Sequence, residues 1–145
     1  MTPFILALVL AFQTPADNFS ILRDQWARNL HEKQIEASVN AYAEDADFIV
    51  PGGNRTHGKV AIRQLFQTIT TTFDSDLVFA SQRVDISGDL AYDSGTFRET
   101  LVTRATGKHQ ESTGSYVTIY RRSKDGAWLI VQQVWTGPPI EPDAK

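Results

Sequence analysis

The stretch that decides the fold is "LAYDSGTFRETLVTRATGKHQESTGSYVTIYRR", residues 90–122. Two runs rich in β-branched and aromatic residues flank Thr106-Gly107-Lys108, a typical hairpin turn. Similar runs lie on either side, "DLVFASQRVDI" (76–86) and "AWLIVQQVWTG" (127–137), joined through Ser87-Gly88-Asp89 and Lys124-Asp125-Gly126. Because consecutive strands joined by short turns pair antiparallel, the second half of the chain predicts an antiparallel meander.

The first half has helical periodicity instead. From Asp17 onward, apolar residues recur at three- and four-residue spacing: Phe19, Leu22, Trp26 and Leu30. Two further helices are predicted from residues that share one face, first Ile35, Val39 and Tyr42, then the apolar positions of residues 59–70. A short strand at 46–50 lies between them and ends at Pro51-Gly52-Gly53. The pattern predicts an α+β domain with three N-terminal helices packed on a strongly curved, mainly antiparallel sheet.

Composition excludes several functional classes. The chain has 145 residues, a formal net charge of -3 and no long basic run, which argues against nucleic-acid binding. It has no cysteine, so disulfides and thiolate chemistry are excluded. The three histidines, His31, His57 and His109, share no metal-ligand spacing, and we predict neither a metal site nor a cofactor.

The N-terminus predicts an export signal. Residues 4–12 are uncharged and apolar, too short to span a bilayer but long enough for the core of a signal peptide. Cleavage at Thr14-Pro15-Ala16 would remove residues 1–16, leaving a domain at 17–137 and a Pro-rich tail at 138–145. The predicted location is therefore secreted or periplasmic. No Lys or Arg precedes the apolar run, so the alternative is an uncleaved apolar arm packed on a cytoplasmic domain.

A phosphate-binding loop is the first hypothesis that the segment after residue 50 suggests. Gly53 to Lys59 has the spacing of the Gly-rich loop that precedes Lys and Ser or Thr. The next residue is Val60, which cannot bind Mg²⁺, and an antiparallel meander does not supply the parallel sheet of such folds. The segment is therefore predicted to be a turn that leads into a helix.

Three segments resemble the nuclear transport factor 2-like (NTF2-like) superfamily, and more narrowly its SnoaL-like branch, which includes many domains of unknown function. They are "YAEDADFIVPGGNRTHGKVAIRQLF" (42–66), "GDLAYDSGTFRETL" (88–101) and "DGAWLIVQQVWTG" (125–137). The resemblance implies a cone in which helices and a bent sheet enclose one apolar pocket. It also implies a homodimer formed through the outer sheet face. We predict no stable membrane insertion, because the apolar segment at residues 4–12 is too short to span a bilayer.

Ketosteroid isomerases are the best-known enzymes on this fold. They need a carboxylate base, together with a Tyr and a protonated Asp that donate hydrogen bonds to the developing oxyanion. The resemblance places these functions at Val50, Trp26 and Thr118. Because none of these side chains matches the required group, we predict that ketosteroid isomerase chemistry is absent.

Strand alternation predicts which side chains face the pocket. On the last three strands the inward sets are Tyr92, Ser94, Thr96 and Arg98; Tyr116, Thr118 and Tyr120; and Leu129, Val131, Gln133 and Trp135. The predicted ligand-binding residues are Trp26, Phe48, Val50, Tyr92, Arg98, Tyr116, Thr118, Gln133 and Trp135. Arg98 would contact an acidic or carbonyl group of the ligand, and Asp93 and Glu99 would face outward. Because a slip of one residue reverses every set, each prediction depends on the register.

These residues support three functional hypotheses. The first is an exported domain that binds a small, largely apolar molecule. The second is a SnoaL-like isomerase, cyclase or dehydratase acting on a carbonyl compound, with His57 as the candidate for proton transfer. The third is a dimeric association module whose cone is filled by its own side chains.

Overall fold

The fold is known from a computed structural model that describes residues 15–140. It contains three helices, listed in chain order as α1 (Pro15–His31), α2 (Ile35–Val39) and α3 (Lys59–Thr72). Its six strands are β1 (Tyr42–Ile49), β2 (Arg55–His57), β3 (Phe73–Ser87), β4 (Leu90–Thr103), β5 (His109–Arg122) and β6 (Trp128–Trp135). The predicted α+β class, with helices before the meander, is confirmed.

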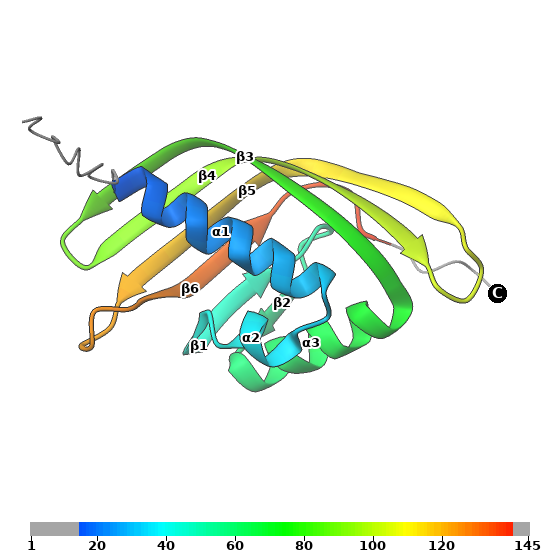
Figure 1. Ribbon diagram of the computed structural model, residues 1–145, viewed down its shortest axis with the longest axis horizontal. Helices are drawn as coiled ribbons and strands as arrows, with labels where there is room; N and C mark the ends of the chain where they lie inside the picture. The colour runs from blue at the N-terminus through cyan, green and yellow to red at the C-terminus, as the bar shows by residue number, and fades with distance from the viewer. Residues whose placement is uncertain (1–14, 141–145) are drawn as a thin grey trace, which may run out of the picture.

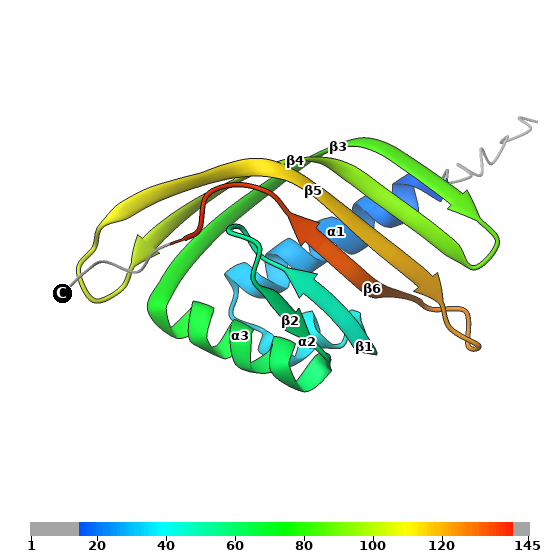
Figure 2. The same ribbon diagram turned by 180° about the vertical axis from the view of Figure 1, so that it is seen from behind.

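The strands form one curved sheet in the order β2-β1-β6-β5-β4-β3. All neighbours pair antiparallel except β1 and β6, which are parallel. In Figure 1, α1 crosses one face of the sheet beneath the arch of β3 to β5, while α2 and α3 lie beside β1 and β2. Figure 2, from behind, shows the opposite face of β4 to β6, over which none of the described helices lies.

Two glycines allow neighbouring backbone to approach where the sheet bends. A Cβ atom on Gly95 of β4 would lie 2.0 Å from the carbonyl oxygen of Ala80 on β3. The pairing of these strands shifts at the same place, between Ser81 and Arg83, as expected for a β-bulge. A Cβ atom on Gly114 of β5 would lie 2.1 Å from the carbonyl oxygen of Thr136. Only glycine fits at these two positions, because a side chain on either residue would push away the neighbouring backbone.

The structure corrects some predicted boundaries. Tyr42 starts β1 and does not share a helical face with Val39, because α2 ends at Val39. β1 therefore begins four residues before the predicted strand at 46–50. The short strand β2, which pairs with the end of β1, was not predicted. It is only three residues long and follows a Gly-Gly turn, so it has too few positions to show alternation.

The core lies between α1, α3 and the concave face of the sheet. Helix α1 buries Phe19, Trp26 and Leu30 as its spacing predicts, whereas Leu22 is exposed. Helix α3 contributes Ile62 and Phe66. The outer sheet face carries exposed apolar side chains as well, including Val78, which is 62% exposed. The homodimer through this face stays a prediction that analytical ultracentrifugation can test.

The predicted export signal falls almost wholly outside the described residues. Helix α1 starts at Pro15, so the predicted cleavage point after Ala16 lies in its first turn. Within residues 15–140, no helix is long and apolar enough to cross a membrane.

Candidate functional site

A cavity of about 190 Å³ opens at one end of the cone. Its walls come from α1, α3, the end of β1 and the turn after it, the start of β3, the last part of β4, the end of β6 and the chain that follows β6. All but two of the side chains that line it are apolar: Trp26, Leu30, Phe48, Val50, Pro51, Asn54, Leu65, Phe66, Ile69, Phe73, Glu99, Leu101, Trp135, Pro139 and Ile140. An apolar wall with few polar groups is the usual composition of a small-molecule site.

Trp135 is the centre of the aromatic packing behind the cavity. Its ring lies 4.7 Å from that of Phe97, 5.5 Å from Phe48, 5.6 Å from Phe79 and 5.8 Å from Trp26, measured between centroids. These edge-on and tilted contacts fill the middle of the cone. The cone is therefore largely packed, but the cavity remains open at the end where α3 passes into β3.

Glu99 is the one ionisable side chain that residues 15–140 contribute to the cavity wall. It projects inward from β4 and is only 3% exposed. Its Oε1 accepts a hydrogen bond of 2.6 Å from the hydroxyl of Ser75 on β3. Burial raises the pKa of Glu99, and this hydrogen bond opposes the rise in part. A carboxyl group in this setting can exchange a proton with a ligand nearer to neutral pH than an exposed Glu can.

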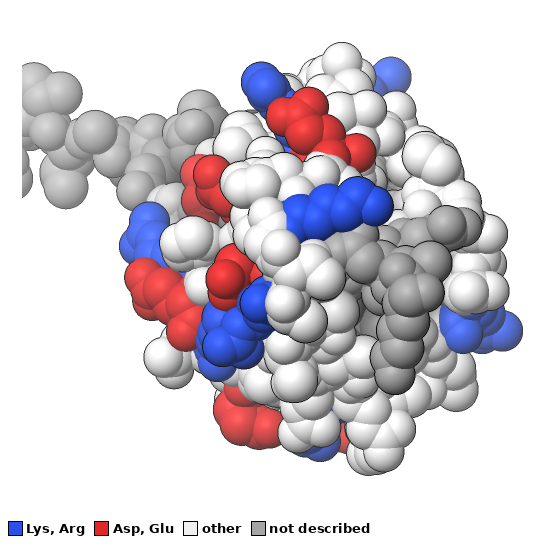
Figure 3. Space-filling view, turned by 90° about the vertical axis from the view of Figure 1, so that its right-hand side faces the viewer, with Lys and Arg blue, Asp and Glu red and all other residues white. Residues whose placement is uncertain are grey.

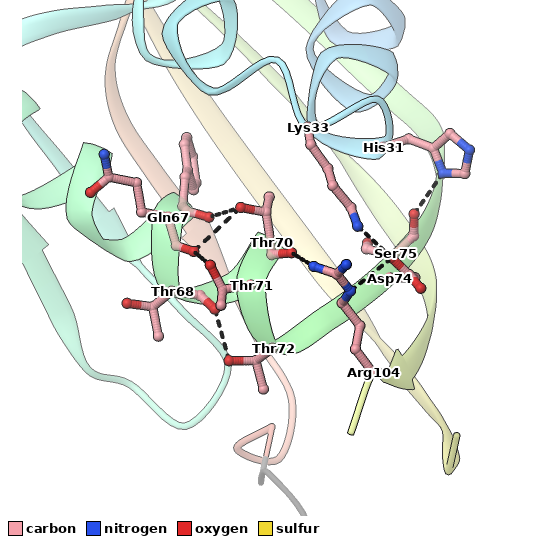
Figure 4. A network of polar contacts seen from close by, with 11 residues as sticks. His31, Lys33, Gln67, Thr68, Thr70, Thr71, Thr72, Asp74, Ser75 and Arg104 are labelled. Carbon is pink, nitrogen blue, oxygen red and sulfur yellow. Dashed lines mark hydrogen bonds and ion pairs between the residues drawn. The ribbon is translucent and has the colours of Figure 1, made fainter. Parts of the chain in front are cut away.

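The surface side of Ser75 carries a polar network, shown in Figure 4. His31 Nδ1 lies 2.7 Å from the carbonyl oxygen of Ser75, and Lys33 forms an ion pair of 2.7 Å with Asp74. Arg104 donates to the carbonyl oxygen of Thr70 at 3.3 Å. The network joins the end of α1, the end of α3 and the start of β3, and so holds Ser75 in place behind Glu99.

A second buried polar cluster lies under the middle of α1. Asp93 on β4 is fully buried and pairs with Arg23 of α1 at 2.7 Å. It also accepts hydrogen bonds from the hydroxyls of Ser81 and Tyr116. Burial and the charge of Asp93 raise the pKa of Tyr116 to about 12. None of these residues lines the cavity, so the cluster connects α1 to the sheet and is separate from the site.

The sequence profile of the SnoaL-like domain matches residues 24–131. The chain belongs to the SnoaL-like domain family. No curated protein matches it.

Solved structures share the fold of this SnoaL-like domain. A ketosteroid isomerase-like protein from Erwinia carotovora atroseptica has a TM-score of 0.77 at 18% identity, covering 89% of this chain and 100% of that chain. An NTF2-like superfamily protein from Salmonella enterica has a TM-score of 0.75 at 20% identity, covering 86% and 91%. A conserved protein from Planctomyces limnophilus has a TM-score of 0.76 at 20% identity, covering 86% and 98%. At these identities the likeness establishes the NTF2-like fold alone.

The structure brings together part of the predicted site. Four predicted ligand-binding residues line the cavity of the SnoaL-like domain: Trp26, Phe48, Val50 and Trp135. Three others face inward as predicted but are buried away from the cavity: Tyr116, Thr118 and Gln133. The Oε1 atom of Gln133 accepts a hydrogen bond from the hydroxyl of Tyr42, so Gln133 is paired within the core. Whether any of these residues binds a ligand stays a prediction.

The predicted facing of β4 is wrong. Tyr92 and Arg98 point to the outer face, where the Tyr92 hydroxyl donates to Asp85 and Arg98 is exposed. Ser94 and Thr96 share that face, whereas Asp93 and Glu99 point inward. The pairing explains the error, because Tyr116 lies opposite Gly95 and paired residues share a face. Once Tyr116 faces inward, the odd-numbered residues of β4 must do so as well.

The predicted facing of β6 is right only near its end. Gln133 and Trp135 are buried, but further back the buried residue is Ile130, not Leu129 or Val131. The β5–β6 pairing shifts by one residue between Ile119 and Tyr120, which leaves Val131 without a direct partner. Simple alternation cannot anticipate such a bulge, because the extra residue reverses the facing of everything beyond it.

His57 lies outside the cavity. It is on β2, paired with Asp47, whereas the next residue of β1, Phe48, faces the cavity. His57 Nδ1 is 2.7 Å from Asp47 Oδ1, and Arg55 donates two further hydrogen bonds to the same carboxylate. The guanidinium of Arg55, followed by His57, lowers the pKa of Asp47. His57 cannot reach a ligand in the cavity, so Glu99 replaces it as the candidate for proton transfer.

The mouth of the cavity is formed by the turn after β1 and by the chain that follows β6. Gly52 N–H donates to the carbonyl oxygen of Gly137 at 3.0 Å, and Pro139 and Ile140 cover one side. We call residues 137–140 the C-terminal strap. Figure 3 shows this end of the molecule, where uncharged side chains predominate and charged ones lie mainly toward the upper and left parts. The first residues of the predicted tail therefore belong to the site.

Proposed function

We propose that this SnoaL-like domain binds a small, largely apolar molecule in the cavity beside Glu99. The observation that carries the proposal is an open apolar volume of about 190 Å³ with one buried acid in its wall. An apolar cavity of about 150 Å³ is enough to bind benzene. The volume therefore suits a one-ring compound with a short substituent better than a four-ring steroid. The filled cone of an association module does not account for this open space.

Filling the cavity tests the proposal. Leu101 faces the cavity, so Leu101→Trp should occupy much of its volume and abolish the response to one-ring compounds. In the parent protein, a compound at about ten times its Kd stabilises the fold by about 1.4 kcal/mol. That gain should raise Tm by roughly 3–6 °C in a thermal-shift assay.

Two variants control this experiment. Val102→Trp puts the same side chain on the opposite face of β4, and Arg98→Ala removes an outward-facing side chain, so both should keep the full response. The proposal is wrong if no one-ring hydrocarbon, alcohol or ketone shifts the Tm of the parent protein. It is also wrong if Leu101→Trp folds and responds as the parent does.

Proton-transfer catalysis on a carbonyl compound is a second candidate function. The raised pKa of Glu99 favours it, because a base that takes a proton from carbon works best when its pKa is near the working pH. Glu99 would remove a proton from the carbon next to the carbonyl, giving an enolate, and the protonated Glu99 would then return a proton to the same carbon. The three positions where ketosteroid isomerases carry their catalytic groups hold Val50, Trp26 and Thr118 in this chain, and none of these side chains can act as the base.

Hydrogen exchange separates catalysis from binding. In D₂O the parent protein should exchange the α-hydrogens of cyclohexanone faster than buffer does, and NMR measures the rate. Glu99→Gln should lower the catalysed rate by at least about 100-fold, the usual contribution of a general base. His57→Gln should leave it unchanged. A parent rate equal to that of buffer would exclude this function for cyclic ketones without affecting the binding proposal.

A further inference from the structure

Unpaired polar atoms gather around the cavity. The indole nitrogen of Trp135, which lines it, is buried without a hydrogen-bond partner among the described residues. The hydroxyl of Ser112 is likewise buried and unpaired. Ser112 lies directly opposite Glu99 in the β4–β5 pairing, so both side chains project to the same face. Buried polar groups nearly always have partners, and the exceptions mark sites where a water or a ligand is bound.

Trp26 contributes a further indole nitrogen to the same wall. It forms no hydrogen bond with good geometry to the described residues, but it lies near enough to the Tyr42 hydroxyl to oppose the rise in the pKa of Tyr42 that burial causes. Its polar atom therefore points toward the core. Asn54 also lines the cavity, but it is exposed at the mouth. Trp135 and Glu99 remain as the two buried polar groups of the described wall with capacity left for a ligand: an indole N–H that can only donate, and a carboxyl group with one hydrogen bond, from Ser75.

We infer that Glu99 and Trp135, with Ser112 behind them, form a polar subsite for an uncharged oxygen group of the ligand. The group is a hydroxyl or a carbonyl. A hydroxyl can accept the Trp135 N–H and donate to the Glu99 carboxylate, and a carbonyl can accept both the Trp135 N–H and the O–H of a protonated Glu99. The apolar remainder of the ligand would lie against Phe48, Phe66 and Leu101. The inference deepens the proposed binding function and rests on it.

The charges around the cavity exclude an anionic ligand. No Lys, Arg or His lines the cavity among the described residues, and Arg98 is on the other face of β4. His31, Lys33 and Arg104 lie on the surface side of Ser75, as Figure 4 shows. A carboxylate ligand would thus be buried beside a second acid without a cation, which is costly. This reverses the expectation that Arg98 contacts an acidic group.

Four cyclohexane derivatives of similar size test the subsite: methylcyclohexane, cyclohexanol, cyclohexanone and cyclohexanecarboxylate. Isothermal titration at pH 7.5 should show the alcohol or the ketone binding about tenfold tighter than the hydrocarbon, the gain of one good hydrogen bond. The carboxylate should bind more weakly than the hydrocarbon. Whichever of cyclohexanol and cyclohexanone has the lower Kd identifies the oxygen group that the subsite prefers.

Variants locate the effect. Glu99→Leu should reduce the preference for oxygen compounds to less than about threefold while hydrocarbon binding persists, and Trp135→Phe should reduce it in part. Glu99→Gln, which keeps shape and hydrogen-bonding capacity, serves if Glu99→Leu does not fold, and it should weaken the rejection of the carboxylate. Glu111→Gln on the exposed part of β5 is the control and should change nothing.

The outcomes separate the two proposals. If none of the four compounds binds, the proposed function itself fails for one-ring ligands. If methylcyclohexane binds as tightly as the alcohol and the ketone, or the carboxylate binds tightest, the binding function stands and the polar subsite is wrong. A preference that survives in both Glu99 variants would also overturn the subsite.

Discussion

Replacing Arg23 by methionine is expected to destabilise the protein by about 3–5 kcal/mol. The Arg23 side chain is only 11% exposed and its guanidinium pairs with Asp93 at 2.7 Å, and Asp93 is fully buried between α1 and the sheet. Without Arg23, only the hydroxyls of Ser81 and Tyr116 would remain beside the carboxylate. Urea denaturation should show a lower midpoint with an unchanged slope.

A double variant distinguishes lost charge pairing from lost packing. Arg23→Met with Asp93→Asn removes both charges and should recover a substantial part of the loss, because the remaining cost comes mainly from an unpaired buried charge. Arg83→Met, which breaks an exposed pair with Asp85, is the control and should cost less than about 1 kcal/mol. Equal stabilities for Arg23→Met and the parent would show that the cluster does not anchor α1.

Gly95→Ala is the second change expected to have a large effect. Its Cβ would lie 2.0 Å from the Ala80 carbonyl oxygen and 2.9 Å from Ser81 Cα, both backbone atoms that cannot rotate away. β3 and β4 would have to separate at the bulge that bends the sheet. We expect a loss of at least about 3 kcal/mol, or no folded protein, as judged by circular dichroism and urea denaturation.

Ser94→Ala is the matched control for Gly95→Ala. Ser94 is the neighbouring residue on the outer face of the same strand, so its change should stay within about 0.5 kcal/mol apart from any difference in strand propensity. A folded Gly95→Ala protein within 1 kcal/mol of the parent would contradict the close contact between β3 and β4.

The fold was readable from the sequence because its main signals are local. Hairpin turns such as Thr106-Gly107-Lys108 and the spacing of Phe19, Trp26 and Leu30 each act within a few residues. Helix α3 and the four consecutive strands of the meander, β3 to β6, followed from such signals. The parallel pairing of β1 with β6 did not, because it joins the two ends of the domain and no local pattern encodes it.

The site was harder to predict because it depends on facing, which a one-residue slip reverses. In β4 the inward set mixes Phe97 and Leu101 with Asp93 and Glu99, and the outward set mixes apolar and polar residues in the same way, so hydrophobicity alone does not decide which face is buried. A signal was present nonetheless. The turn at residues 104–108 fixes the pairing of β4 with β5, and the aromatic pair Tyr116 and Tyr120 on β5 indicates which face is inward.

The family resemblance located the pocket but not its acid. It directed attention to Val50, which does line the cavity but has no proton to transfer. The acid that the structure reveals, Glu99, comes from the antepenultimate strand and touches Ser75. The pocket therefore lies where the family resemblance places it, but its acidic side chain comes from β4 and not from the end of β1.

The C-terminal strap has a consequence for the kinetics of ligand exchange. Because Pro139 and Ile140 form part of the mouth, ligand entry and exit on that side depend on displacing the C-terminal strap. The contact of Gly52 with Pro139 and the hydrogen bond to Gly137 hold this segment closed, so they should slow dissociation as well as strengthen binding.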